Sequence, residues 1–176
     1  GGVFIVKNKS EMNIKEARKK INNSLKHNYY YAMREWPYKD VKPRIIIEKY
    51  MESSKEEGIK DYKIFCFNGE PKFTLVCSNR NGRNKNTDFY DLEWNLLPFT
   101  RARHNNSKNG IEKPNKYDEM IKIARNLSKD IPFVRVDLYE INNQIFFGEL
   151  TFFPSGGFEG FSPKEWDEKL GNWIEL

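Results

Sequence analysis

The residues best suited to chemistry in this chain are four polar side chains on two short apolar segments. Arg135 and Asp137 alternate with valine in one segment, and Glu149 and Thr151 flank a leucine in the next. Side chains two positions apart on a strand share a face, so each pair is predicted to project together. Two carboxylates that meet repel each other unless a cation lies between them, and hard oxygen ligands favour Mg²⁺. If the pairs meet, Arg135 is placed to neutralise a transferring phosphoryl group; the alternative is that it bridges both acids in a structural ion pair.

Whether Asp137 meets Glu149 depends on the register of a hairpin between residues 133–141 and 144–152. A direct Asp137–Glu149 pair requires a loop with an odd number of residues, such as 142–144. A two-residue loop of two asparagines places the carboxylates on opposite faces unless a bulge restores the phase.

The first half of the chain offers two candidate nucleotide contacts. Gly1 and Gly2 precede a predicted strand at 3–7 and can end a glycine-rich loop that cradles phosphates, or form an ordinary turn. A β-branched run at 44–50 predicts a strand that leads into a charged loop, and its end suits an adenine-binding hinge. The alternative is a plain edge strand. The hinge residues are Glu48, Lys49, Tyr50 and Met51.

A second hairpin is predicted around the sequence Asn-Gly-Glu-Pro at 68–71. Pairing Phe67 with Lys72 puts Asp61, Lys63 and Ser78 on one face, with Arg80 two residues further on. That face suits ribose and phosphate, or is a solvated charged edge.

The two cysteines are predicted to be reduced thiols of the core. The same pairing places Cys66 opposite Phe73 and Cys77 opposite Tyr62, so no disulfide is expected. Neither cysteine has CxxC spacing, which argues against a zinc site.

The composition narrows the class of protein. The chain has 176 residues and a net charge of +5, with 30 basic and 25 acidic residues interspersed, so a nucleic-acid partner is not indicated. No apolar run approaches the ~20 residues of a membrane span, and no signal segment is present, which predicts a cytoplasmic protein without a membrane span. The chain opens on glycine without an initiator methionine, so we interpret it as a fragment whose N-terminal part is missing.

The pattern of apolar residues predicts both helices and antiparallel strands around these residues, which indicates an α+β fold. Apolar spacing predicts helices over 14–27, 117–129 and 163–170, and strands over the two hairpins. Residues 79–116 are expected to form a long loop with short strands.

Several stretches, taken together, resemble the ATP-grasp enzymes and, more narrowly, the family named for the teichuronopeptide-biosynthesis protein TupA. The resemblance spans nearly the whole chain. The matching stretches are Arg34-Glu35-Trp36-Pro37-Tyr38, Pro43-Arg44-Ile45-Ile46-Ile47-Glu48-Lys49-Tyr50, Asp61-Tyr62-Lys63-Ile64-Phe65-Cys66-Phe67-Asn68-Gly69-Glu70-Pro71, Arg135-Val136-Asp137-Leu138-Tyr139 and Phe147-Gly148-Glu149-Leu150-Thr151-Phe152.

The resemblance implies two lobes of antiparallel sheet with helices that hold ATP between them. Residues 1–50 would be part of the small nucleotide-binding lobe and end in the hinge, and residues 51–176 would be the large lobe with the metal site. On that analogy the adenine contacts the hinge, Asp61 lies near the ribose, and Lys63 and Arg80 approach the phosphates. Mg²⁺ is held by Asp137, Glu149 and Thr151, while Arg135 steadies the phosphoryl group.

Two departures from the family pattern matter. The last metal ligand is commonly Asn, whereas this chain has Thr151, whose hydroxyl is a weaker donor. The strand that supplies an ATP-binding lysine is expected upstream of Gly1, so the chain alone is expected to bind Mg-ATP weakly.

The resemblance implies an Mg-ATP-dependent ligase that joins a carboxylate to an amine through an acyl-phosphate. Its substrates are expected to be a small molecule or sugar acid and an amine such as an amino acid, in cell-envelope polysaccharide or teichuronopeptide biosynthesis. One alternative is a non-catalytic nucleotide-binding relative. The other is a basic RNA-binding module that uses Arg80, Arg83, Lys85, Arg101 and Arg103.

Overall fold

The computed structural model describes residues 2–51, 59–78, 86–102, 105–107 and 109–175. The chain divides into two compact units, Gly1–Glu52 and Ser53–Leu176, which are described separately. No helix in the described part of the chain is long and apolar enough to cross a membrane.

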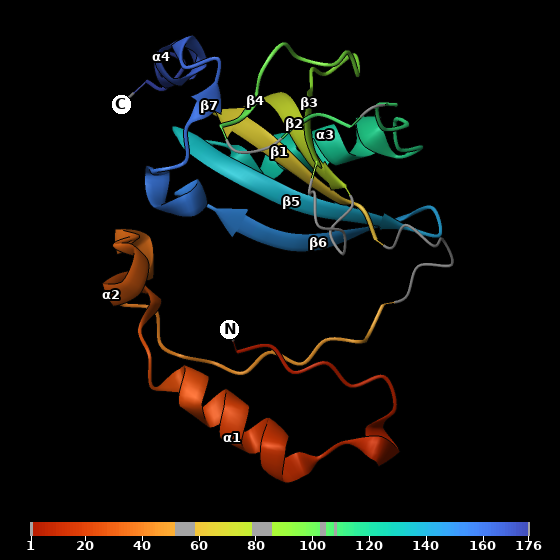
Figure 1. The fold of residues 1–176 in the computed structure, drawn as a ribbon, viewed down its shortest axis with the longest axis vertical. Coiled ribbons are helices and arrows are strands. Elements are labelled where there is room, and N and C mark those ends of the chain that lie inside the picture. Colours follow the sequence, from red (N-terminus) through yellow and green to blue (C-terminus); the bar gives the residue numbers. More distant parts are fainter. Residues whose placement is uncertain (1, 52–58, 79–85, 103–104, 108, 176) are drawn as a thin grey trace. The chain divides into compact units, whose positions relative to one another are not determined.

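Unit 1 consists of two helices and irregular segments. Helix α1 (Ile14–Leu25) begins where the side chain of Asn13 accepts a hydrogen bond from the Glu16 amide, and α2 (Tyr29–Met33) begins similarly at Asn28. Short 3-10 turns cover Lys9–Glu11 and Trp36–Tyr38. Figure 1 draws this unit in red and orange.

The two strands predicted in unit 1, at 3–7 and 44–50, are wrong: both runs are irregular. A β-branched run becomes a strand only when its backbone groups pair with a neighbour. The described part of unit 1 forms no such ladder, and Ile46 and Ile47 are 80% and 91% exposed.

Unit 2 is built on a five-stranded antiparallel sheet in the order β3-β2-β1-β5-β6 (Figure 1). A second, two-stranded sheet joins β4 and β7. The strands are β1 (Asp61–Phe67), β2 (Glu70–Ser78), β3 (Asn86–Tyr90), β4 (Thr100–Arg101), β5 (Phe133–Ile141), β6 (Gln144–Thr151) and β7 (Phe161–Ser162). The helices are α3 (Tyr117–Ser128) and α4 (Glu165–Gly171). The mixture of helix and antiparallel sheet matches the predicted α+β class.

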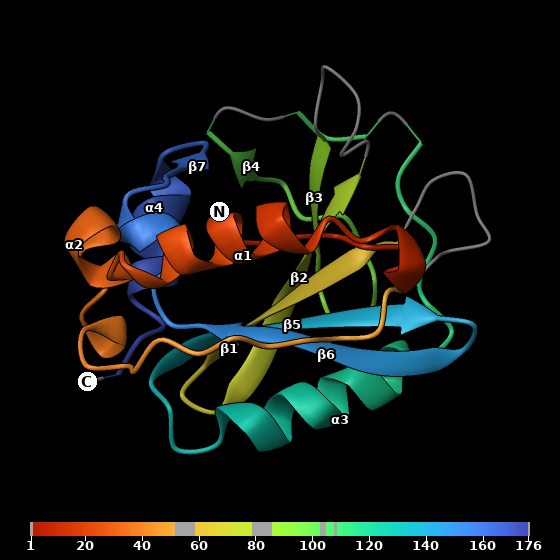
Figure 2. The same cartoon turned by 90° about the horizontal axis from the view of Figure 1, so that it is seen from below.

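The two faces of the large sheet are filled differently. Helix α3 runs along one face, as Figure 2 shows, where its Met120 and Ala124 pack against Ile64 and Val136. On the other face, β1, β2 and β3 carry an aromatic cluster that includes Phe89, which packs with residues of the small sheet and α4. The inner strands β1 and β5 and the edge strand β6 carry polar side chains on that same second face.

The hairpin of β1 and β2 is tighter than predicted. Asn68 and Gly69 form a two-residue turn with φ of 52° and 81°, so Phe67 pairs with Glu70 instead of Lys72. After a shift beyond Cys66, Cys77 lies opposite Asp61. The predicted partners of both cysteines are therefore wrong, and so is the register that grouped Ser78 with Asp61 and Lys63.

The corrected register separates the two cysteines. Cys66 points into the core beneath α3, and Cys77 packs with the aromatic cluster on the opposite face. Both are thiols. Burial raises the pKa of the Cys66 thiol to about 11.

Candidate active site

A bulge in β6 brings the two predicted metal carboxylates to one face of the sheet. Near the turn Leu138 pairs with Phe147, but after a shift in the ladder Asp137 pairs with Glu149. Gly148 is the extra residue. The two-asparagine loop and the compensating bulge are thus both present, with φ of 51° and 60° at the turn.

Gly148 fits the bulge because it lacks a side chain. A Cβ at this position would lie 2.8 Å from Cε2 of Tyr139 and 2.9 Å from the carbonyl oxygen of Asp137. Contacts this short do not occur, so another residue would have to push the strands apart. No role was predicted for Gly148 from the sequence, although a glycine inside a strand is a known signal of a bulge.

Arg135 connects the acidic residues of β5 and β6. Its guanidinium donates to both oxygens of Asp137, with Nε–Oδ1 2.7 Å and Nη2–Oδ2 2.8 Å. The same Nη2 lies 3.0 Å from Oε1 of Glu149 and 2.9 Å from Oγ1 of Thr151. Asp137 is 1% exposed, whereas the Glu149 side chain is 62% exposed, so the cluster runs from the interior to the surface.

Lys63 completes the cluster from the neighbouring strand. It lies opposite Asp137 in the ladder between β1 and β5, and its ammonium is hydrogen-bonded to Oδ2 of Asp137. Its Nζ also lies 2.6 Å from Oδ2 of the buried Asp61. Lys63 and Arg135 therefore pair with three carboxylates on three adjacent strands.

The surroundings fix the charge state of Arg135. Burial alone would lower the pKa of its guanidinium, but the hydrogen bonds and charge of Asp137, together with Glu149 and Asp61, raise the pKa above its ordinary value. The cation is thus permanent.

The oxygen atoms of this cluster are of the chemical kind that binds a hard divalent cation. Asp137, Glu149 and Thr151 supply two carboxylates and a hydroxyl on one face, which is the oxygen set that Mg²⁺ prefers. No group of three or more His, Cys, Asp or Glu side chains in the described residues is arranged to hold a metal. Protein cations contact both carboxylates, so a metal must compete with them.

The other predicted nucleotide contacts belong to unit 1 or fall outside the described residues. Gly2 and the hinge segment from Glu48 to Met51 belong to unit 1. Gly2 packs closely on Ser24, and Tyr50 stacks under Lys7, whose Nζ lies 5.4 Å from the ring centroid. Gly1 and Arg80 fall outside the described residues.

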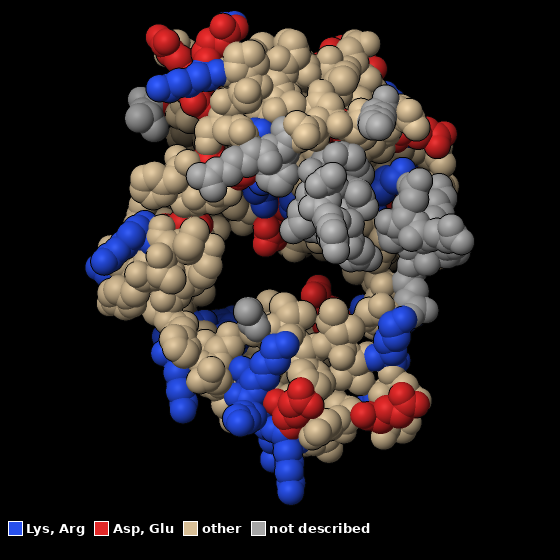
Figure 3. All heavy atoms as spheres, in the orientation of Figure 1, with Lys and Arg blue, Asp and Glu red and all other residues tan. Residues whose placement is uncertain are grey.

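The basic residues of the RNA-binding alternative are described only in part. Arg101 makes an ion pair of 2.9 Å with Glu159. Arg80, Arg83, Lys85 and Arg103 are outside the described residues. Figure 3 shows acidic and basic side chains intermixed on the visible surface of unit 2.

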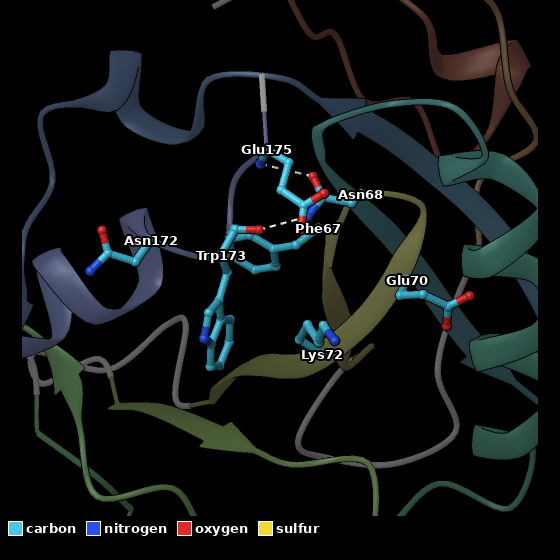
Figure 4. A pocket seen from close by; sticks show the side chains of 7 residues that line it. All are labelled: Phe67, Asn68, Glu70, Lys72, Asn172, Trp173 and Glu175. Carbon is cyan, nitrogen blue, oxygen red and sulfur yellow. Dashed lines mark hydrogen bonds between the residues drawn. The ribbon is translucent and has the colours of Figure 1, made fainter.

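A separate hollow of about 520 Å³ lies beside the turn between β1 and β2 (Figure 4). Asn68 makes two hydrogen bonds to the C-terminal segment there. Its Nδ2 donates to the carbonyl of Trp173 at 2.7 Å, and its Oδ1 accepts from the amide of Glu175 at 3.0 Å. None of the residues predicted for the site lines this hollow.

Comparison with known protein families gives a match to this chain. A family model described as TupA-like ATP-grasp covers residues 1–175. No curated protein and no solved structure shows a significant match.

Proposed function

Because the chain belongs to the TupA-like ATP-grasp family, whose members have ATP-dependent ligase-like function, we propose that it binds Mg-ATP and activates a carboxylate as an acyl-phosphate for attack by an amine. The substrates we propose are a small molecule or sugar acid and an amine such as an amino acid, in cytoplasmic steps of cell-envelope polysaccharide or teichuronopeptide biosynthesis.

The observation that carries this proposal is the shared face of Lys63, Arg135, Asp137 and Glu149. Phosphoryl transfer is catalysed mainly by positioning and by cations around the phosphates. Two basic and two acidic side chains on three adjacent strands provide groups for both tasks.

The proposed roles follow from the chemistry of each side chain. Asp137 and Glu149 would hold Mg²⁺, assisted by the Thr151 hydroxyl, and the bound ion would supply positive charge against the phosphates. Arg135, a fixed planar cation, steadies the transferring phosphoryl group. The other roles we propose are those that the family resemblance implies: Asp61 would serve the ribose, Lys63 and Arg80 the phosphates, and residues 48–51 the adenine, while Gly1 and Gly2 would end a phosphate loop.

Calorimetry with Mg²⁺ and a non-hydrolysable ATP analogue tests nucleotide binding. Asp137→Asn should weaken binding by about tenfold or more, because a metal ligand is lost. Asp118→Asn, which removes a carboxylate that is 87% exposed on α3, should leave binding unchanged. Equal affinities in the two variants would remove Asp137 from the metal site.

ADP release in the presence of panels of carboxylates and amines tests the ligase step. Release that needs both substrates supports the proposal. Nucleotide binding without such release would favour the non-catalytic relative.

A further inference from the structure

On the premise of this proposed function, we propose that Lys63 is a built-in counter-ion that keeps a divalent cation off Asp137 until a nucleotide draws the lysine away. In the folded chain the ammonium of Lys63 occupies the place beside Asp137 that the metal would take. Metal and nucleotide would then bind together, and the metal alone would bind poorly.

The hydrogen bonds of Asp137 show why a metal must compete with Lys63 for this carboxylate. Its Oδ2 accepts from both Lys63 Nζ and Arg135 Nη2, and its Oδ1 accepts from Arg135 Nε. A carboxylate oxygen offers about two acceptor sites. Oδ2 is thus fully used, and Asp137 can ligate a metal through that oxygen only after one of the two cations leaves.

Lys63 is the cation that can leave. Arg135 is held by hydrogen bonds to Asp137, Glu149 and Thr151 in a fixed fork. Lys63 carries a compact charge on a flexible stem and is bound to Asp61 and Asp137 alone among the partners described. Its side chain is also the more exposed of the two, at 13% against 8%.

Charge balance explains why a nucleotide is required. The cluster holds three carboxylates and two cations, so a divalent ion that enters alone makes the buried site positive and meets repulsion from Lys63. Triphosphate oxygens bring negative charge that outweighs the charge added by the metal, and they attract the ammonium and so free Oδ2. The lysine thereby couples the two binding events.

Mn²⁺ binding to the 176-residue chain, measured by electron paramagnetic resonance, tests this inference. Lys63→Met should raise the affinity for Mn²⁺ alone by at least about tenfold, because a repelling charge is removed and Oδ2 is freed. The same variant should lower the affinity for the ATP analogue in the presence of Mn²⁺. The two affinities are thus expected to change in opposite directions.

Two variants serve as controls. Lys72→Met removes an exposed lysine of β2 and should change neither affinity. Lys63→Arg keeps the charge and should keep Mn²⁺ binding weak, as in the natural chain. Circular dichroism establishes that each variant is folded, and Lys63→Gln replaces the methionine variant if that one unfolds.

The outcomes separate this inference from the proposed function. If Lys63→Met binds Mn²⁺ no more tightly than the natural chain, while the natural chain binds Mn²⁺ with the ATP analogue, the counter-ion role is wrong and the nucleotide site stands. If the natural chain binds neither Mn²⁺ nor the analogue at millimolar concentrations, both proposals are overturned.

Discussion

At the scale of single residues, the cluster depends on Arg135 more than on any other side chain. It contacts Asp137, Glu149 and Thr151 at once. The alternation of strand residues alone predicted that Arg135 projects with Asp137 and Glu149 with Thr151. It left open whether Arg135 pairs with both acids, because that contact depends on the register of a neighbouring strand.

Arg135→Lys should lower the free energy of unfolding by about 2 kcal/mol. Lysine keeps the charge but cannot supply the parallel hydrogen bonds to the buried Asp137, so an acceptor is left unsatisfied. Urea denaturation measures the effect. Arg125→Lys is the matched control: Arg125 pairs with Glu70 at 3.0 Å on the surface, and its loss should cost less than about 0.5 kcal/mol. Equal costs would show that the guanidinium geometry of Arg135 is unimportant for stability.

The raised pKa values of three buried groups predict that the protein becomes less stable as the pH rises above neutrality. Burial raises the pKa of Tyr62 and of Tyr117 to about 12 and that of Cys66 to about 11. Above pH ~9 to 10 the unfolded chain therefore loses protons that the native chain retains, and the free energy of unfolding falls as pH rises, by up to about 1.4 kcal/mol per pH unit for each group. Denaturation between pH 8 and 11 measures the slope. Tyr117→Phe should reduce the slope above pH ~10; an unchanged slope would contradict the assignment.

At the scale of elements, the boundaries of the large hairpin were predictable and its internal register was not. Strand β5 covers the predicted residues 133–141, and β6 ends one residue before the predicted 152. Turn chemistry identified the two asparagines, but the position of a bulge depends on close packing against Tyr139. The first hairpin was misread because Asn68-Gly69 forms the tighter of the two possible turns.

The bulge itself can be tested by substitution and by deletion. Gly148→Val should destabilise the fold by about 1–3 kcal/mol and abolish Mn²⁺-nucleotide binding, because its side chain meets Tyr139 and favours a regular ladder that turns Glu149 away from Asp137. Deletion of Gly148 should retain binding, since Phe147 and Glu149 keep their present partners without the extra residue.

The same affinity and urea measurements on Gly171→Ala provide the control. A Cβ at Gly171 in α4 meets no atom within 4 Å, so neither stability nor binding should fall. If the deletion behaves like Gly148→Val, the glycine acts through more than the phase of the strand.

At the scale of the whole molecule, the two units differ in how much hydrophobic core each contains. Among the described residues Ala17 is the one buried hydrophobic residue of unit 1, whereas both hydrophobic clusters lie entirely in unit 2. The sequence predicted a division near residue 50 from family resemblance. It could not predict that the β-branched runs of the first unit stay unpaired, because pairing depends on which partner strands are present.

Residues 53–176 alone should therefore fold cooperatively. The apolar burial that opposes chain entropy lies almost wholly in this segment. Thermal unfolding followed by circular dichroism should give a single transition within a few degrees of that of the full chain. Residues 1–52 alone should show no cooperative transition, and a sharp one would contradict this account of the core.

The division of one sheet face into an aromatic half and a charged half has a dielectric consequence. Phe65 lies opposite Arg135, and Leu75 lies opposite Lys63, so apolar groups border the charges on one side. Such a border lowers the local dielectric constant and limits the access of mobile ions. The aromatic cluster thus keeps water and ions from one side of the charged groups. The charges of Arg135, Asp137 and Lys63 therefore act on one another and on any bound anion with little screening.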